Sequence, residues 1–164
     1  MKKIILSAIM LVAIGFAAQA QRISKNALGF RISDNDGFGG EISYQRAVSS
    51  GNRLEFDLGW RNSNHYDAFK VTGLYQWVWN IEGDFNWYAG VGGGLGSWDH
   101  NHHDNHQYDD SGTFVYAAGD IGIEYGFKEV PILISLDARP EIRTGYHDDD
   151  NFGFDVGLGI RYQF

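Results

Sequence analysis

The chain has 164 residues, a formal net charge of −8 and no cysteine. An acidic chain is a poor partner for nucleic acid, whose phosphates require a basic patch, and the lack of cysteine excludes disulfides and cysteine-ligated metal. The combination of 22 glycines, 15% aromatic residues and only two prolines is unusual for a soluble domain.

The first twenty residues have the pattern of a secretory signal peptide. Lys2 and Lys3 precede a mostly apolar run from Ile4 to Ala18, and Ala18-Gln19-Ala20 forms a small-x-small cleavage site before Gln21. The apolar run is shorter than the roughly 20 residues that a membrane-spanning helix needs. No cysteine follows the cleavage site, which excludes a lipoprotein anchor. We therefore expect residues 1–20 to be removed and residues 21–164 to form one domain.

Eight segments after this leader alternate apolar and polar residues, which is the period of a β-strand. Each is near the roughly 9–11 residues that a tilted membrane-crossing strand requires. In chain order the predicted strands are Asn26–Ser33, Phe38–Ala47, Arg53–Asn62, Asp67–Trp79, Asn86–Trp98, Thr113–Phe127, Ile132–Gly145 and Phe152–Phe164. The chain is therefore predicted to be all-β.

The last predicted strand shows the alternation most clearly. From Phe152 to Phe164 every second residue is apolar, and the residues between them are glycines, Asp155, Arg161 and Gln163. One apolar face and one face of glycine and charge suit a strand with lipid outside and a polar lumen inside. Because lipid cannot hydrogen-bond an exposed backbone, the sheet must close without edges. The predicted fold is an eight-stranded, antiparallel, up-and-down transmembrane β-barrel.

The predicted inward faces carry nearly balanced charge. The inward cations are Arg31, Arg53, Arg61, Lys70, Arg139, Arg143 and Arg161, and the inward anions are Glu41, Glu55, Asp57, Asp120, Glu124, Asp137, Glu141 and Asp155. Charges inside a low-dielectric wall must pair, or each costs several kcal/mol. Eight strands leave an interior that side chains can fill. We therefore expect an ion-pair network that plugs the interior, with no open pore.

Aromatic residues gather near the predicted strand ends, as in the interfacial girdles of membrane barrels. One predicted rim holds Trp60, Phe69, Phe114 and Phe152, and the other holds Tyr44, Trp77, Trp79, Trp87, Tyr125, Tyr162 and Phe164. Two features fit the pattern less well. Pro140, at a lipid-facing position, predicts a bulge or an early strand end. The glycines at 90, 92, 93, 94 and 96 either make room for large inward side chains or permit sharp bending.

These features resemble the small eight-stranded outer-membrane barrels of Gram-negative bacteria, the OmpA-like and OmpX-like families. The Ala18-Gln19-Ala20 cleavage site, the eight alternating segments and the terminal GLGIRYQF carry the resemblance. It implies an integral outer-membrane protein in contact with lipid and lipopolysaccharide, with both termini in the periplasm. It also implies that the barrel-assembly machinery reads the last strand through Phe164. Family members include structural barrels, adhesins and a few lipid-modifying enzymes.

With this topology all six histidines fall in the outer connections: His65, His100, His102, His103, His106 and His147. Imidazole and carboxylate suit Zn²⁺, Cu²⁺ or Ni²⁺. The candidate ligands of a weak metal site are His100, His102, His103, His106, His147 and Asp148. The spacing matches no rigid ligand framework, and a flexible loop loses conformational entropy on binding. A hydrated acidic loop that keeps the outer end soluble is the alternative interpretation.

A lipid A-modifying enzyme is a further alternative. A hydrolase needs a nucleophile near a base and an orienting acid. No predicted strand contains a histidine, although Ser97 and Ser111 flank the histidine-rich connection. We therefore expect a non-enzymatic barrel with a structural role, or a role in binding an extracellular ligand or surface through its acidic, histidine-rich outer connections. No cofactor is expected beyond a weakly bound divalent metal.

Overall fold

The computed structural model describes residues 23–33, 39–63, 66–99, 111–144 and 151–164. They form eight strands: β1 (Asn26–Ser33), β2 (Glu41–Ala47), β3 (Asn52–Ser63), β4 (Tyr66–Glu82), β5 (Phe85–Asp99), β6 (Ser111–Gly126), β7 (Ile132–Thr144) and β8 (Phe152–Gln163). All eight predicted strands are therefore confirmed. The signal peptide expected at residues 1–20 lies outside the described residues.

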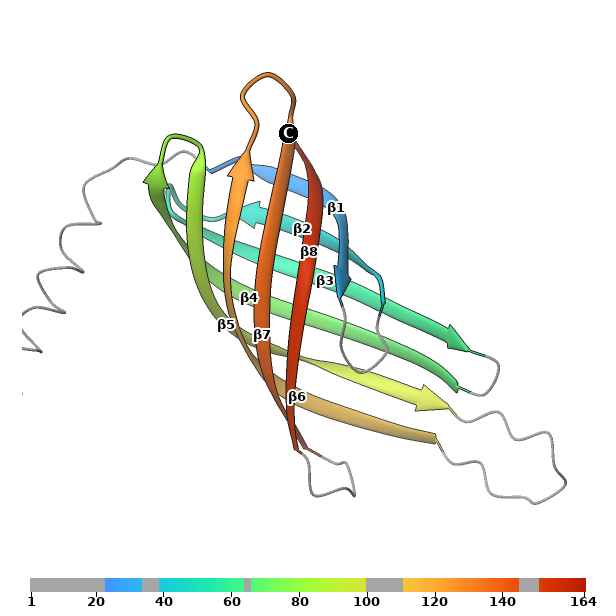
Figure 1. The fold of residues 1–164 in the computed structure, drawn as a ribbon. Coiled ribbons are helices and arrows are strands. Elements are labelled where there is room, and N and C mark those ends of the chain that lie inside the picture. Colours follow the sequence, from blue (N-terminus) through green and yellow to red (C-terminus); the bar gives the residue numbers. More distant parts are fainter. Residues whose placement is uncertain (1–22, 34–38, 64–65, 100–110, 145–150) are drawn as a thin grey trace, which may run out of the picture.

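The sheet closes on itself. Every strand pairs antiparallel with its neighbour in the chain, and β1 also pairs with β8, which completes a barrel (Figure 1). At the seam, the Asn26 amide donates to the carbonyl oxygen of Phe164 at 3.0 Å, and the Phe164 amide donates back to Asn26 at 2.9 Å. A closed sheet leaves no unpaired edge, as a strand protein in lipid requires.

The two ends of the barrel differ in their connections. One end holds Asn26 and Phe164 together with the short turns at 48–51, 83–84 and 127–131, and we call it the terminal end. The opposite end, which we call the loop end, is where β1, β3, β5 and β7 finish and β2, β4, β6 and β8 begin. Figure 1 shows that β3 to β6 reach beyond β1 and β2 at this end.

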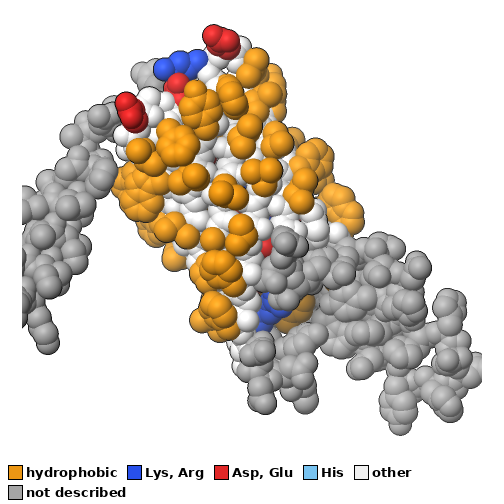
Figure 2. All heavy atoms as spheres, viewed as in Figure 1, with side chains coloured by type: hydrophobic (Ala, Val, Ile, Leu, Met, Phe, Trp, Pro, Cys, Tyr) orange, Lys and Arg blue, Asp and Glu red, His pale blue; other side chains and the backbone are white. Residues whose placement is uncertain are grey.

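Each strand turns apolar residues outward and polar residues inward. In β8 exposed and buried positions alternate along nearly the whole strand, with Ile160 52% exposed and its neighbour Arg161 1% exposed. Figure 2 shows hydrophobic side chains covering the wall of the barrel, while the visible charged side chains gather toward its ends. Because the side-chain period of a strand is two, one register fixes both faces at once.

A tight turn joins β4 to β5 at the terminal end. β4 continues to Glu82, three residues beyond the predicted end at Trp79, and the pairing with β5 shifts by one residue between Asn80 and Glu82. Gly83 has a φ of 57°, a conformation that glycine adopts without steric cost. The Asn80 side-chain amide donates to the Gly83 carbonyl oxygen at 2.8 Å and fixes the turn.

Three glycines of β5 lie against bulky inward side chains of the neighbouring strands. A Cβ on Gly90 would meet the Gln76 side chain, one on Gly94 would meet the Tyr116 ring, and one on Gly96 would meet the Phe114 ring. Of the two interpretations offered by the sequence, the structure supports room for large neighbours at these three positions.

Pro140 neither bulges β7 nor ends it, so that prediction is wrong. β7 continues to Thr144, and Pro140 pairs with Phe154 of β8. The pairing of β6 with β7 omits two positions, between Ala118–Glu141 and Ile121–Ala138, with the same register on both sides. Proline has no amide hydrogen to donate, so the ladder loses rungs there while the strands stay aligned.

The prediction that Phe114 belongs to the outer aromatic rim was also wrong. Phe114 is 7% exposed and packs inside the barrel with Leu74, Tyr116 and Ala118, rather than in the outer girdle. Its position obeys the same alternation that turns Val115 outward, so the physical reason is strand parity. Phe152 and Trp60, predicted for the same rim, do face outward, at 63% and 52% exposure.

Candidate functional site

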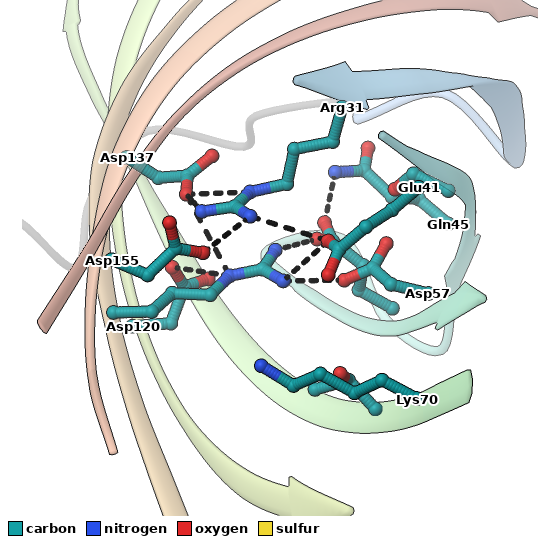
Figure 3. Close-up of polar contacts among 12 residues, drawn as sticks. Arg31, Glu41, Gln45, Asp57, Lys70, Asp120, Asp137 and Asp155 are labelled. Atoms are coloured by element: carbon teal, nitrogen blue, oxygen red, sulfur yellow. Dashed lines mark hydrogen bonds and ion pairs between the residues drawn. The ribbon is translucent and has the colours of Figure 1, made fainter. Parts of the chain in front are cut away.

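A network of charged side chains fills much of the interior of the barrel (Figure 3). Arg31 of β1 reaches carboxylates on three other strands. Its Nε donates to Asp137 Oδ1 at 2.8 Å, and its Nη1 contacts Asp155 Oδ2 at 2.7 Å and Glu41 Oε2 at 3.2 Å. Arg31 is fully buried, so these contacts replace the water that a charge in this position would otherwise need.

Arg139 of β7 is the second centre of the network. Its guanidinium pairs with Glu55, with Asp57 Oδ2 at 2.6 Å and with Asp120 Oδ1 at 3.4 Å. Glu41 and Asp137, which also pair with Arg31, lie 3.6 Å from it. The two arginines thus share carboxylates, and one continuous network links opposite walls of the barrel.

Further pairs extend the network toward both ends. On the terminal side, Arg161 donates to Ser43 Oγ at 2.9 Å and to Ser135 Oγ at 2.7 Å, and its Nη2 lies 3.3 Å from Glu55. On the loop side, Lys70 pairs with Glu141 at 2.5 Å. The lysine ammonium also lies 4.7 Å from the centroid of the Tyr116 ring, within the range of a cation–π interaction.

The sequence predicted these charged residues well. All eight predicted inward carboxylates are buried, and so are Arg31, Arg53, Lys70, Arg139 and Arg161. Arg143 is partly exposed and pairs with Glu141 at 3.2 Å. The side chain of Arg61, the remaining predicted cation, lies outside the described residues.

Neutral interior residues were missed by the sequence reasoning. Gln76 and Tyr88 are fully buried and bind the network: Gln76 accepts from Arg53 Nε at 2.6 Å, and Tyr88 donates to Asp137 Oδ2 at 3.4 Å. The signal that could have found them is their parity, because both occupy inward positions of their strands. They supply hydrogen bonds where a salt bridge leaves donors or acceptors unused.

The predicted metal ligands cannot be compared with the structure. His100, His102, His103, His106, His147 and Asp148, and also His65, lie outside the described residues. Within the described ranges, no group of three or more His, Asp or Glu side chains is arranged to hold a metal ion. Metal capture by the outer connections stays a prediction.

The outer wall is apolar along its length. Leu136 and Leu158 are neighbours on β7 and β8, 48% and 45% exposed, in a surface that water would not favour. Aromatic residues cluster on this wall near the terminal end: Trp79 stacks on Trp87 at 4.4 Å between centroids. An apolar exterior around a charged interior is the arrangement of a barrel that crosses a membrane.

No helix within the residues that the structure describes is long and apolar enough to cross a membrane.

No protein-family model and no curated protein matches this chain. Solved structures do match its fold. The N-terminal β-barrel domain of Pseudomonas aeruginosa OprF is 14% identical, with a TM-score of 0.61 over 87% of this chain and all of that one. Ail, the attachment invasion locus protein of Yersinia pestis, is 16% identical, with a TM-score of 0.58 over 88% of this chain and 99% of that one.

Neisserial surface protein A is 12% identical, with a TM-score of 0.60 over 85% of this chain and 94% of that one. A second structure of Ail is a complex with the heparin analogue sucrose octasulfate. The fold is therefore the small eight-stranded barrel of outer-membrane proteins. Together with the apolar wall, this fold is that of an integral membrane barrel.

Proposed function

We propose that the chain is a non-enzymatic outer-membrane barrel with a plugged interior, which serves the envelope structurally and presents its loop end to ligands or surfaces outside. The observation that carries this proposal is the shared network of Arg31 and Arg139, whose carboxylate partners come from five strands: β2, β3, β6, β7 and β8. A solute crossing the lumen would have to separate these pairs, and each broken buried pair costs about 3–5 kcal/mol.

Conductance in planar bilayers tests the plugged interior. The protein should give no large, steady channels, because the pairs close the lumen at its centre. A variant with both Arg31→Ala and Arg139→Ala should conduct more than the parent if it still folds. Arg143→Ala serves as a matched control, since Arg143 is partly exposed and pairs away from the centre. Large steady channels from the unaltered protein would contradict the proposal.

The chemistry of the loop end suggests the class of partner. The four connections at that end, 34–38, 64–65, 100–110 and 145–150, contain eight aspartates and neither lysine nor arginine. Ail has been solved with a sulfated heparin analogue, but a polyanion would be repelled by the acidic segments of this chain. We therefore propose a cationic surface or ligand, whose binding should weaken as salt rises. A partner that binds equally well at high and low salt would oppose this.

The histidines of the same connections support a second candidate function, capture of a divalent metal. The strand ends that flank 100–110 and 145–150 lie at one end of the barrel, so both segments start from the same rim. Isothermal titration with Zn²⁺ and Cu²⁺ should give heat that is lost when His100, His102, His103 and His106 are replaced by Ala. Equal heat from both proteins, or none, would end the metal proposal.

The absence of enzymatic activity has its own test. Every histidine lies outside the described residues, so a Ser–His–Asp arrangement could form only with those segments. We expect lipid A from cells with and without the protein to have the same acyl pattern by mass spectrometry. A changed pattern would favour the enzyme.

We also propose that the terminal end faces the periplasm, that lipopolysaccharide surrounds the outer half of the wall, and that the barrel-assembly machinery reads β8 through Phe164. Phe164 is 60% exposed beside the seam of β1 and β8, where a strand-reading partner could contact it. Replacing Phe164 with Ser should lower the amount of folded protein in outer membranes. An unchanged amount would count against recognition of this residue.

A further inference from the structure

Arg46 is a charged residue on the outer wall of the barrel, near the terminal end. It lies next to the last residue of β2 and shares a face with Ile42 and Tyr44, whereas its neighbour Gln45 is buried in the interior. The other strand cations whose side chains the structure describes face the interior: Arg31, Arg53, Lys70, Arg139, Arg143 and Arg161. Among these residues, Arg46 is therefore the one cation that the outer wall presents to its surroundings.

The guanidinium of Arg46 is held in place by residues of the same wall. Asn26 of β1 pairs with Arg46 across the sheet. Arg46 Nη1 donates to Asn26 Oδ1 at 2.8 Å, and the Tyr44 hydroxyl donates to the same oxygen at 2.9 Å. The side-chain nitrogen of Asn26 donates in turn to a terminal carboxyl oxygen of Phe164 at 3.4 Å. Both ends of the Asn26 amide are therefore used, and they fix the guanidinium beside the seam of the barrel.

Most of the donors of Arg46 have no acceptor within the part of the chain that the structure describes. There Arg46 forms no ion pair, and its guanidinium makes a single hydrogen bond, to Asn26. A guanidinium carries several N–H donors in a planar fork that matches the oxygens of an anion. Arg46 is an exposed residue, so such an anion can approach it from outside the chain. Lys128 is also an exposed cation at this end, but it pairs with Asp84 at 3.0 Å.

Apolar side chains lie beside this cation on the side toward the middle of the barrel. Tyr44 pairs with Leu28 of β1 and with Phe56 of β3, which are 47% and 48% exposed on the outer wall. At the seam, the rings of Tyr162 and Phe164 lie 6.2 Å apart. Arginines and aromatic rings at the end of an apolar wall are typical of the level where hydrocarbon meets lipid headgroups.

We propose that Arg46 binds the phosphate of a phospholipid whose acyl chains lie along Leu28 and Phe56. The phosphate is the anion that phospholipids place at this level, and its oxygens accept parallel hydrogen bonds from a guanidinium. A soluble anion would match the guanidinium but not the apolar wall beside it. Asn26 stands between this cation and the terminal carboxylate of Phe164. The choice of a phospholipid over lipopolysaccharide rests on the proposed orientation, with the terminal end facing the periplasm.

Native mass spectrometry of the protein in nonionic detergent micelles tests the site, with dioleoylphosphatidylethanolamine as the probe. Because the chain is acidic overall, a lipid without net charge avoids general repulsion. Titration should show one lipid that binds before the others. Dioleoylglycerol has the same acyl chains but no phosphate, and it should bind at least about tenfold more weakly. Inorganic phosphate should not displace the lipid, because it has no acyl chains.

Two variants connect this binding with Arg46. Arg46→Gln should weaken binding of the first lipid about tenfold, because the charge and the planar fork are lost. Lys128→Gln is the matched control, since it removes an exposed cation at the same end that lies in a turn and already pairs with Asp84. It should bind the lipid as the parent does. Both positions are exposed, so both proteins should fold, which gel mobility before and after heating checks.

The proposal stands if the phospholipid binds first, if dioleoylglycerol binds more weakly, and if Arg46→Gln but not Lys128→Gln lowers the affinity. It is overturned if dioleoylglycerol binds as tightly, if Arg46→Gln binds unchanged, or if Lys128→Gln loses as much affinity. Displacement of the lipid by inorganic phosphate would also overturn it.

A separate measurement tests the orientation on which the choice of lipid rests. The chain has no cysteine, so Val130→Cys in the turn at 127–131 gives a single thiol at the terminal end. A membrane-impermeant maleimide should leave this thiol unlabelled in intact cells and label it after the outer membrane is opened. Labelling in intact cells would overturn a phospholipid as the partner of Arg46. The titration in micelles does not depend on orientation, so its failure would leave the proposed orientation intact.

Discussion

Arg139 is the residue whose loss should cost the barrel most. It pairs with Asp57 and Asp120 and lies near Glu41, so Arg139→Met would leave several buried carboxylates without their cation. Breaking a buried pair on one side costs about 3–5 kcal/mol, and we expect at least this loss in the free energy of unfolding. Denaturant unfolding of the protein in lipid vesicles, followed by tryptophan fluorescence, measures it.

Arg143→Met is the control for that measurement. Its guanidinium is partly exposed, and solvent screens its pair with Glu141. We expect a loss of about 0–1 kcal/mol. If Arg139→Met and Arg143→Met lowered the free energy of unfolding equally, the network centred on Arg139 would contribute no more stability than a partly exposed ion pair.

Substituting a glycine that lies against a buried arginine should cost nearly as much stability as losing Arg139. A Cβ on Gly157 would overlap the guanidinium of Arg31, which is fixed by its carboxylates. We expect Gly157→Ala to cost roughly 1–3 kcal/mol of stability through overpacking. Gly73→Ala is the matched control, because a Cβ there would lie 3.8 Å from the Phe56 ring on the outer wall. Thermal unfolding followed on gels should show that Gly157→Ala unfolds at a lower temperature than Gly73→Ala. A Gly157→Ala protein as stable as this control would show that Arg31 can move.

For single residues, the sequence predicts whether a side chain points inward or outward better than it predicts which residues that side chain contacts. Alternation alone placed Arg139 and Glu55 inside, and both are buried. Phe114 was assigned to a girdle because it is aromatic and near a strand end, although its parity already pointed inward. The three-dimensional partners of Arg31 could not be predicted, since they depend on which strands face each other across the lumen.

Among the strands, the pairing of β6 with β7 has a local defect. The ladder omits the rungs at Pro140 and its neighbour Arg139, while the register is the same on both sides. Pro140→Val would restore an amide hydrogen opposite Gly119. We expect a gain of about 0.5–1.5 kcal/mol, the net value of one hydrogen bond. Hydrogen exchange at residues 117–121 should slow in the same variant.

Ala138→Val is the control for this comparison. Ala138 also faces the outer wall of β7, but its pairing with Ile121 is intact, so the substitution adds apolar volume without a new rung. Slower exchange in both variants would mean that side-chain volume, and not the missing hydrogen bond, limits this seam.

The strands themselves could be predicted because each crosses an apolar layer and must keep its alternation throughout. Their ends were less predictable. β4 extends to Glu82, where its pairing with β5 shifts by one residue, and a two-residue turn follows. Alternation does not encode these features of local backbone geometry. The prediction that Pro140 would bulge or end β7 was also wrong. Pro140 pairs with Phe154, so the neighbouring strand β8 keeps β7 aligned.

For the whole molecule, closure and polarity are consistent with one pattern, since strands with an apolar outer face and a charged inner face suit a closed barrel whose wall lies in lipid. This is why the fold could be predicted although no family model matches the chain. The cavity at the terminal end, which Ala27 and Gly126 help to line, could not be predicted, because residues of all eight strands contribute to it. The histidine-rich connections carry no such pattern to fix their geometry.

The position of the membrane across the barrel gives the last prediction. Leu158 lies midway along β8 on the outer wall, between Ile32 of β1 and Leu136 of β7, whereas Val130 lies in a turn at the terminal end. Both are 45% exposed, so burial within the protein does not distinguish them. A cation on the lipid face costs about 2–4 kcal/mol at the midplane and about 0–1 kcal/mol near an interface. Leu158→Arg should therefore destabilise the barrel in vesicles far more than Val130→Arg. If the two variants unfolded at the same denaturant concentration, the apolar wall around β8 would not lie in lipid.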